Sequence, residues 1–138
     1  MVITRKIEIR TRGECDLIDI TDRVQSEIAS AGIDSGTVTL FIGGSTAGLT
    51  TIEYESGVLK DLQEMWERLV PRNIPYKHDS RWGDGNGYSH VRASLLGPSL
   101  VVPFSGKRLL TGTWQQIVIA DFDNRPRSRE VIVQIMGE

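Results

Sequence analysis

Apolar and polar residues alternate near both ends of the chain. Over residues 3–10 the isoleucines share one face of an extended segment, and over residues 130–136 the valines and an isoleucine do the same. Because successive side chains of a strand point to opposite sides, both segments predict half-buried β-strands. Further runs rich in β-branched and aromatic residues predict three more strands, over residues 37–42, 99–104 and 109–120.

Apolar residues at helical spacing predict two helices. The first covers residues 21–31 and ends at Gly32, a residue that readily adopts the left-handed conformation found after helices. The second covers residues 57–70, with Ser56 as its capping residue and Pro71 ending it. Leu59, Leu62, Trp66 and Leu69 form its apolar stripe.

The order of these elements predicts the fold class. Strands outnumber helices and do not alternate with them, which argues against a parallel βαβ array. Residues 105–107 would join two strands as a hairpin, and the polar, Gly- and Pro-rich residues 71–87 would form a long loop. We therefore expect one α+β domain over residues 1–138, with an antiparallel β-sandwich-like core and two helices packed outside.

Composition narrows the function classes. The 138 residues carry a net charge of −2, with 39% hydrophobic and 25% charged residues, as in an ordinary globular domain. This balance argues against binding to nucleic acid or to an anionic membrane, because both need clustered Lys and Arg. No transmembrane run or signal peptide is visible, and Cys15 is the only cysteine, which excludes an internal disulfide and a multi-cysteine zinc site. A cytoplasmic location is the expectation.

A Gly-rich segment follows the predicted strand 37–42. Its sequence is Gly43-Gly44-Ser45-Thr46-Ala47-Gly48, but Leu49 stands where a nucleotide-binding P-loop needs lysine, so that motif is rejected. Backbone N–H groups and the hydroxyls of Ser45 and Thr46 could still hold an anion. A tight connection between strands is the alternative interpretation.

The predicted loop and the residues after it carry both histidines of the chain. His78, which is followed by Asp79, and His90 could act as a general base or, with a carboxylate, bind a metal. Their spacing matches no compact metal motif, so two unrelated surface histidines are the alternative. Residues 84–87 begin like a calcium loop, but an EF-hand is rejected because Tyr88 follows and no flanking helix pair is expected.

Two further groups of charged residues are candidates for acid–base catalysis or for anion binding. On a strand, Glu53 and Glu55 would share a face and repel each other, which can raise a pKa for acid–base catalysis, but a solvated polar face is the favoured explanation from these residues alone. Residues 124–129 hold three arginines between strands. Their planar donors suit phosphate or carboxylate, on a ligand or on a neighbouring subunit.

The order of these motifs resembles the YjbQ/UPF0047 family over essentially the whole chain. The resemblance rests on Gly-Ser-Thr-Ala, Glu, His-Asp, Ser-His-Val-Arg, Gly-Pro-Ser, Gly-Thr-Trp-Gln and Pro-Arg-x-Arg, in that order. Members are described as secondary thiamine-phosphate synthases. The resemblance implies an α+β fold with a sandwich-like core, assembled as a homotrimer with pockets near subunit boundaries.

The resemblance also implies roles for individual residues. Those implied to be catalytic are Glu53, His78, Asp79 and His90. Those implied to bind substrate are Ser45, Thr46, Asn86, Gln115 and Arg127. Some members hold a metal through histidines, which implies a divalent ion, zinc or magnesium, on His78 and His90. The family's further histidine position falls on Gly44, which offers no ligand.

The activity that the resemblance implies joins an aminopyrimidine methyl diphosphate to a thiazole phosphate and releases pyrophosphate. Arg127 and the Gly-Ser-Thr loop would bind the anions, and Trp82 or Trp114 would stack on a ring. The partners expected are a phosphorylated small molecule and other copies of the chain, with no nucleic acid and no membrane. A non-catalytic trimer that binds metal or anion, and a metal-dependent hydrolase, are the alternatives.

Overall fold

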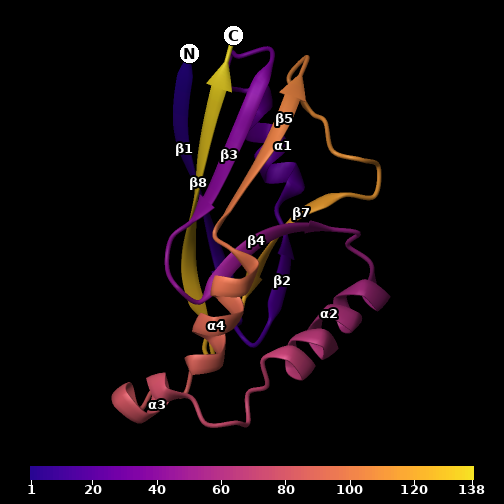
Figure 1. Ribbon diagram of the computed structural model, residues 1–138. Helices are drawn as coiled ribbons and strands as arrows, with labels where there is room; N and C mark the ends of the chain where they lie inside the picture. Colours follow the sequence, from indigo (N-terminus) through magenta and orange to yellow (C-terminus); the bar gives the residue numbers. More distant parts are fainter.

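Two antiparallel sheets form the body of the protein in the computed structural model, which describes residues 1–138 (Figure 1). The five-stranded sheet has the order β1-β8-β3-β5-β6, and the three-stranded sheet has the order β2-β7-β4. The strands are β1 (Val2–Thr11), β2 (Asp16–Asp19), β3 (Gly36–Ile42), β4 (Ala47–Ile52), β5 (Ser99–Ser105), β6 (Arg108–Leu109), β7 (Gln116–Asp121) and β8 (Arg127–Gly137).

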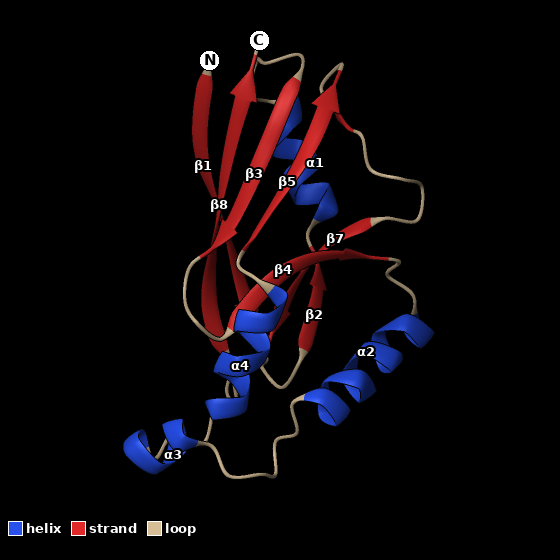
Figure 2. Ribbon diagram, viewed as in Figure 1, coloured by secondary structure: helices blue, strands red, loops and turns tan.

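Helices lie behind the five-stranded sheet and beside the three-stranded sheet, and the front of the five-stranded sheet stays uncovered (Figure 2). The four helices are α1 (Thr21–Ala29), α2 (Ser56–Leu69), α3 (Lys77–Trp82) and α4 (Gly87–Leu96). The α+β class and the antiparallel pairing are confirmed, whereas the expectation of two helices is wrong. The segment expected as a long loop contains α3, and α4 follows directly, so a helix pair does flank residues 84–87.

The three-stranded sheet is buried on both faces. Its inner face joins the five-stranded sheet and α1 in a cluster of 19 buried residues, which includes Ile117 and Ile119. Its outer face joins α2 and α4 in a second cluster, in which Trp66 meets Phe122 edge to face at 4.9 Å between ring centroids. Strand β7 therefore takes part in both cores, and the burial of its apolar side chains is the main source of stability here.

Local sequence explains most element boundaries. Gly106 and Lys107 form a two-residue turn between β5 and β6, as expected for a hairpin. Helix α2 begins one residue early because the Glu55 carboxylate, rather than Ser56, caps it by accepting hydrogen bonds from the N–H groups of Gly57 and Val58. These bonds hold the pKa of Glu55 below its usual value.

The long strand predicted over residues 109–120 is interrupted. Strand β6 ends at Leu109 and β7 starts only at Gln116, with an exposed loop between them. In that loop Gln115 closes a turn with Gly112: the Gln115 N–H donates to the Gly112 carbonyl, and the Gln115 side chain accepts from the Gly112 N–H. Trp114 lies in this loop, exposed to solvent.

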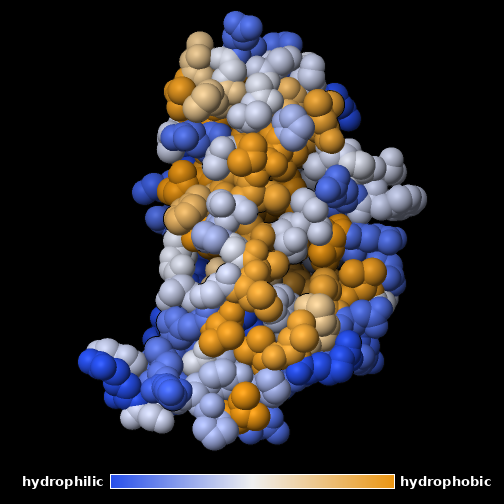
Figure 3. Space-filling model, in the orientation of Figure 1, coloured by the Kyte–Doolittle hydropathy of each residue, from blue (hydrophilic) through white to orange (hydrophobic).

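The outward face of the five-stranded sheet is apolar over a wide area (Figure 3). Side chains from neighbouring strands contribute to it, among them Val2, Phe41, Val101 and Met136, each about half exposed or more. Exposed apolar patches are typical of interaction surfaces. None of the helices has both the length and the apolar character needed to cross a bilayer.

Candidate functional site

The space between the two sheets is apolar along most of its length and becomes polar at one end. Strand β7 places Ile117, Ile119 and then Asp121 on its inner face, and Asp123 follows in the same alternation. Strand β8 continues its inward valines back to Arg129, with Arg127 two residues earlier. Two carboxylates from one sheet thus meet two guanidinium groups from the other.

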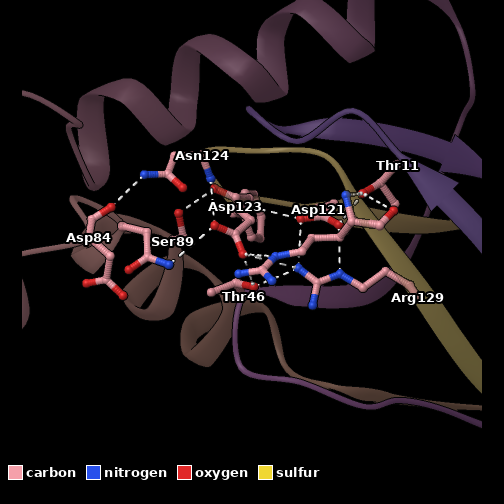
Figure 4. Close-up of polar contacts among 11 residues, drawn as sticks. Thr11, Thr46, Asp84, Ser89, Asp121, Asp123, Asn124 and Arg129 are labelled. Carbon is pink, nitrogen blue, oxygen red and sulfur yellow. Dashed lines mark hydrogen bonds and ion pairs between the residues drawn. The ribbon is translucent and has the colours of Figure 1, made fainter. Parts of the chain in front are cut away.

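These four side chains form a closely bonded cluster, called here the arginine–aspartate wall (Figure 4). Arg129 binds Asp121 through two bonds, Nε to Oδ2 at 2.8 Å and Nη2 to Oδ1 at 3.0 Å. Arg127 Nε donates to Asp123 Oδ2 at 2.7 Å. Both carboxylates are completely buried, so their charges need these partners.

Two threonines complete the hydrogen bonding of the wall. Thr11 donates from Oγ1 to Asp121 at 2.6 Å, and Thr46 donates from Oγ1 to Asp123 at 3.0 Å. Thr46 also accepts a bond of 2.6 Å from Arg129 Nη2. Burial alone would raise the pKa of Asp123, but hydrogen bonds from Arg127 and Asn86 outweigh it and hold that pKa below the usual value.

Three guanidinium nitrogens of this wall remain without a protein acceptor: both terminal nitrogens of Arg127, and Nη1 of Arg129. Arg129 Nη1 lies against Gly44, where an added Cβ atom would come within 2.8 Å of it. Gly44 also has a φ of +101°, which side-chain-bearing residues rarely adopt. The glycine in the Gly-Ser-Thr loop is what allows the guanidinium to reach this position.

The opposite side of the site consists of His78, Asp79, Asp84 and His90, called here the histidine wall. The two imidazole rings lie 4.3 Å apart between centroids, although they are twelve positions apart in sequence. Both histidines line one pocket, so they are not two unrelated surface residues. Burial, and secondarily the neighbouring His78, lowers the pKa of His90, which keeps that ring neutral at pH 7.

A pocket of about 370 Å³ separates the two walls. Of the residues singled out from the sequence, Ser45, Thr46, His78, Asn86, His90 and Arg127 line it. Asp79 adjoins the pocket through His78, and its Oδ1 also accepts the Gly87 N–H at the start of α4 at 2.8 Å. Trp82 and Asp84 line the pocket as well.

Two predicted site residues lie elsewhere. Glu53 follows the far end of β4, and Gln115 precedes the far end of β7, since Ile52 pairs with Gln116 there while Ala47 pairs with Asp121 beside the pocket. Both are exposed, and Gln115 Nε2 donates to Thr51 Oγ1 at 3.1 Å. Within one chain, neither reaches the pocket, and their catalytic and binding roles stay predictions.

Sequence reasoning missed the buried carboxylates Asp121 and Asp123. A signal was present, because the inward alternation of β7 runs Ile117, Ile119, Asp121, Asp123 without a break in period. The alternation of β8 likewise runs from Arg127 and Arg129 into inward valines. Opposite charges that continue two apolar strand faces indicate a polar end of one sandwich.

Comparisons with known proteins agree with this architecture. A family model described as UPF0047 protein YjbQ-like matches residues 5–138. A UPF0047 protein of Archaeoglobus fulgidus is 39% identical over 131 residues, covering 95% of this chain and 99% of the relative. The UPF0047 protein YjbQ of Escherichia coli O157:H7 is 33% identical, covering 86% and 87%. The crystal structure of a YbjQ-like protein of unknown function from Sulfolobus solfataricus superposes with a TM-score of 0.93 at 30% identity, covering 100% and 99%.

Proposed function

Since this chain belongs to the YjbQ-like UPF0047 family, we propose that its pocket binds a phosphorylated small molecule and acts as a secondary thiamine-phosphate synthase. One observation carries the proposal: unpaired guanidinium nitrogens of Arg127 and Arg129 face a pair of adjoining histidines across a single open pocket. Guanidinium groups suit phosphate oxygens, and a histidine pair suits the reacting end of a substrate.

The proposed reaction breaks one C–O bond and forms one C–N bond. The ring nitrogen of a thiazole phosphate supplies the electron pair that attacks the methylene carbon of an aminopyrimidine methyl diphosphate. Pyrophosphate leaves with the electrons of the broken C–O bond, and the thiazole becomes a thiazolium cation. No proton must be transferred for this balance, so alignment of the two rings and stabilisation of the leaving group are the main requirements.

The two walls meet these requirements in different ways. Arg127 and Arg129 are already fixed by their aspartates, so they would bind pyrophosphate oxygens without reorganising. His90 is neutral, so its ring N–H can donate a hydrogen bond to a departing oxygen without adding a positive charge. Trp82, largely exposed at the pocket, offers a flat surface for one of the rings.

A divalent metal is part of the expectation from the resemblance, and the residues fit one. The pocket region holds imidazole nitrogens and carboxylate oxygens within reach of one another. Such an ion, when bound, would neutralise charge on the leaving pyrophosphate. Gly44 supplies no side chain to it, so a three-histidine site is not available in this chain.

A homotrimer is also part of the proposal. The support is the apolar outward face of the five-stranded sheet around Phe41, Val101 and Met136. Its exposed apolar side chains form a patch and are not scattered singly (Figure 3). Glu53 and Gln115, remote from the pocket of their own chain, would then contribute only to the pocket of a neighbouring copy. Light scattering should give three times the 15.4 kDa chain mass, and a monomer at micromolar concentration would refute the trimer.

An assay for thiamine phosphate tests the function. The chain is incubated with both substrates, with and without Mg²⁺, and the product is measured as its fluorescent oxidation derivative. We expect product with the native chain and a loss of about 100-fold in turnover for His90→Ala, the scale of one positioned hydrogen-bond donor to a developing negative charge. Arg108→Ala, at an exposed residue of β6, should match the native chain.

The alternatives give different results in the same assay. If pyrophosphate binds but no thiamine phosphate forms, the protein is a non-catalytic anion-binding protein and not an enzyme. Metal-dependent release of orthophosphate without thiamine phosphate would identify a hydrolase.

A further inference from the structure

Asp84 is brought next to His78 by the way α3 ends. Gly83 terminates the helix in the left-handed conformation, with a φ of 74°, and so turns the chain back over it. The backbone carbonyl of Asp84 is then held by the Asn124 side chain at 2.8 Å, which fixes this turn to the loop after β7 (Figure 4). Asp79 lies directly beside His78 on α3. One imidazole therefore faces two carboxylates.

We propose that His78, Asp79 and Asp84 bind a divalent cation, of the Mg²⁺ or Mn²⁺ class. His78 Nδ1 lies 3.5 Å from Asp79 Oδ1 and 3.6 Å from Asp84 Oδ1. These separations are too long for good hydrogen bonds. They are slightly longer than the 3.0–3.4 Å that separates neighbouring ligands of one ion when the metal–ligand bonds are about 2.1 Å, so a small movement of either carboxylate would complete the site. All three ligand atoms lie within 4.8 Å of one another.

Charge supports a cation at this place. Within ion-pair distance, neither Asp79 nor Asp84 has a lysine or arginine partner; His78 is the only basic side chain there. The arginine–aspartate wall is balanced within itself, two arginines against two aspartates. The pocket as a whole is therefore negative although it presents guanidinium donors for an anion. A divalent ion removes this conflict, because it cancels the two carboxylates and attracts the phosphate oxygens.

An unpaired buried oxygen in the same pocket gives independent support. Asn86 is only 5% exposed, lines the pocket, and its Oδ1 has no hydrogen-bond partner. The amide cannot be reversed to relieve this, because Asn86 Nδ2 donates to Asp123, which as a carboxylate only accepts. A buried acceptor without a partner indicates a missing donor or ion. Carboxylate and amide oxygens are the ligands that Mg²⁺ and Mn²⁺ prefer.

This ligand set differs from the pair of histidines that the family resemblance implies. His78 is common to both, but Asp79 and Asp84 replace His90, whose ring stays free for the reaction. The cation's part in holding a diphosphate rests on the proposed function, whereas the site itself rests only on the geometry of these residues. The two are separable by experiment.

Binding of Mn²⁺ to the full-length chain, followed by electron paramagnetic resonance, tests the site. We expect saturable binding of one Mn²⁺ per chain, weakened at least tenfold in Asp84→Asn, since a charged ligand is lost. His78→Gln should weaken it similarly. His90→Gln should stay within about twofold of the native chain. Asp61→Asn, at an exposed carboxylate of α2, is the matched control for lost charge and should have no effect.

The outcomes that overturn the site are distinct. Absence of saturable Mn²⁺ binding, or equal affinity in the native chain and Asp84→Asn, refutes it. Loss of binding in His90→Gln with retention in Asp84→Asn would establish the histidine pair instead. Asp84 is exposed, so Asp84→Asn should fold normally, and a urea unfolding curve verifies this. Pyrophosphate affinity measured with and without Mn²⁺ then tests the proposed function alone, because the site stands if Mn²⁺ binds without affecting the anion.

Discussion

The arginine–aspartate wall and the histidine wall face each other across one pocket but differ in burial and in contact distance. In the first, charged groups from two sheets make bonds of 2.7–3.0 Å around fully buried carboxylates. In the second, groups on α3 and in the turn after it are partly exposed and stand 3.5–3.6 Å apart. The first wall is an element of the fold that also offers donors, whereas the side chains of the second are held by fewer and longer contacts.

The largest difference is expected in stability. Asp121→Ala leaves the buried Arg129 without its two-bond partner and removes the 2.6 Å bond from Thr11 Oγ1, which should lower the free energy of unfolding by about 3–5 kcal/mol. Urea unfolding monitored by circular dichroism measures this. Asp84→Ala, in the histidine wall, should change stability by less than about 0.5 kcal/mol. Equal losses in the two variants would contradict the contrast between the walls.

Anion binding should depend on the terminal nitrogens of Arg127. Arg127→Ala is expected to weaken pyrophosphate binding by about 1.5–3 kcal/mol, the scale of a hydrogen bond to a charged group. Calorimetric titration measures the affinity, and Arg108→Ala controls for a lost exposed arginine. Arg127 has its acidic partner, Asp123, within its own chain. If sedimentation shows a dissociated assembly while anion affinity is unchanged, Arg127 is an assembly residue and the binding role is wrong.

The backbone at Gly44 offers a test of how tightly Arg129 of the arginine–aspartate wall is confined. Gly44→Ala must place a Cβ atom 2.8 Å from Arg129 Nη1 at a φ of +101°, so we expect a loss of about 1–2 kcal/mol in stability. Its neighbour Gly43 has open space around it, and Gly43→Ala should be nearly neutral. Equal unfolding curves for the two variants would show that the loop adapts and that Arg129 is not confined by it.

The smallest expected effect is a pKa difference in the second wall. Burial, and secondarily His78, lowers the pKa of His90, so NMR titration of chelator-treated protein should place it below 6.5. The folded state then binds fewer protons than the unfolded state, so stability is full above pH 6.5 and declines as pH falls towards the folded pKa. His78→Gln should move the His90 pKa partly upward. If the pKa of His90 is the same in His78→Gln, burial alone lowers it.

Much of the fold was predictable, because alternation in β1, β3 and β8 and helical spacing in α1 and α2 reflect one-sided burial. Helix α4 was not predictable from apolar spacing. Its buried face includes Ser89 and Arg92, whose side chains bond the carbonyls of Phe122 and Val70 in place of apolar packing. A polar residue buried by hydrogen bonding looks exposed in a hydrophobic pattern.

The site was predictable only residue by residue. Histidines and an Arg-rich segment can be recognised in the sequence as candidate functional groups. Nothing in the spacing of His78 and His90 indicates that α3 and α4 bring their rings together. The resemblance to a family supplied that grouping. It did not supply Asp121, Asp123 or Asp84, which acquire their meaning from the pairing of two sheets and from the turn at Gly83.

Strand β7, shared by both cores, and helix α3 differ in how readily they open locally. The residues of β7 from Ile117 to Asp121 have almost no exposed surface, so its amide hydrogens should exchange with solvent only when the whole chain unfolds. Helix α3 has no buried residue, so its amides should exchange through brief local openings. A ligand would then meet one surface that opens only with the whole protein and another that opens locally.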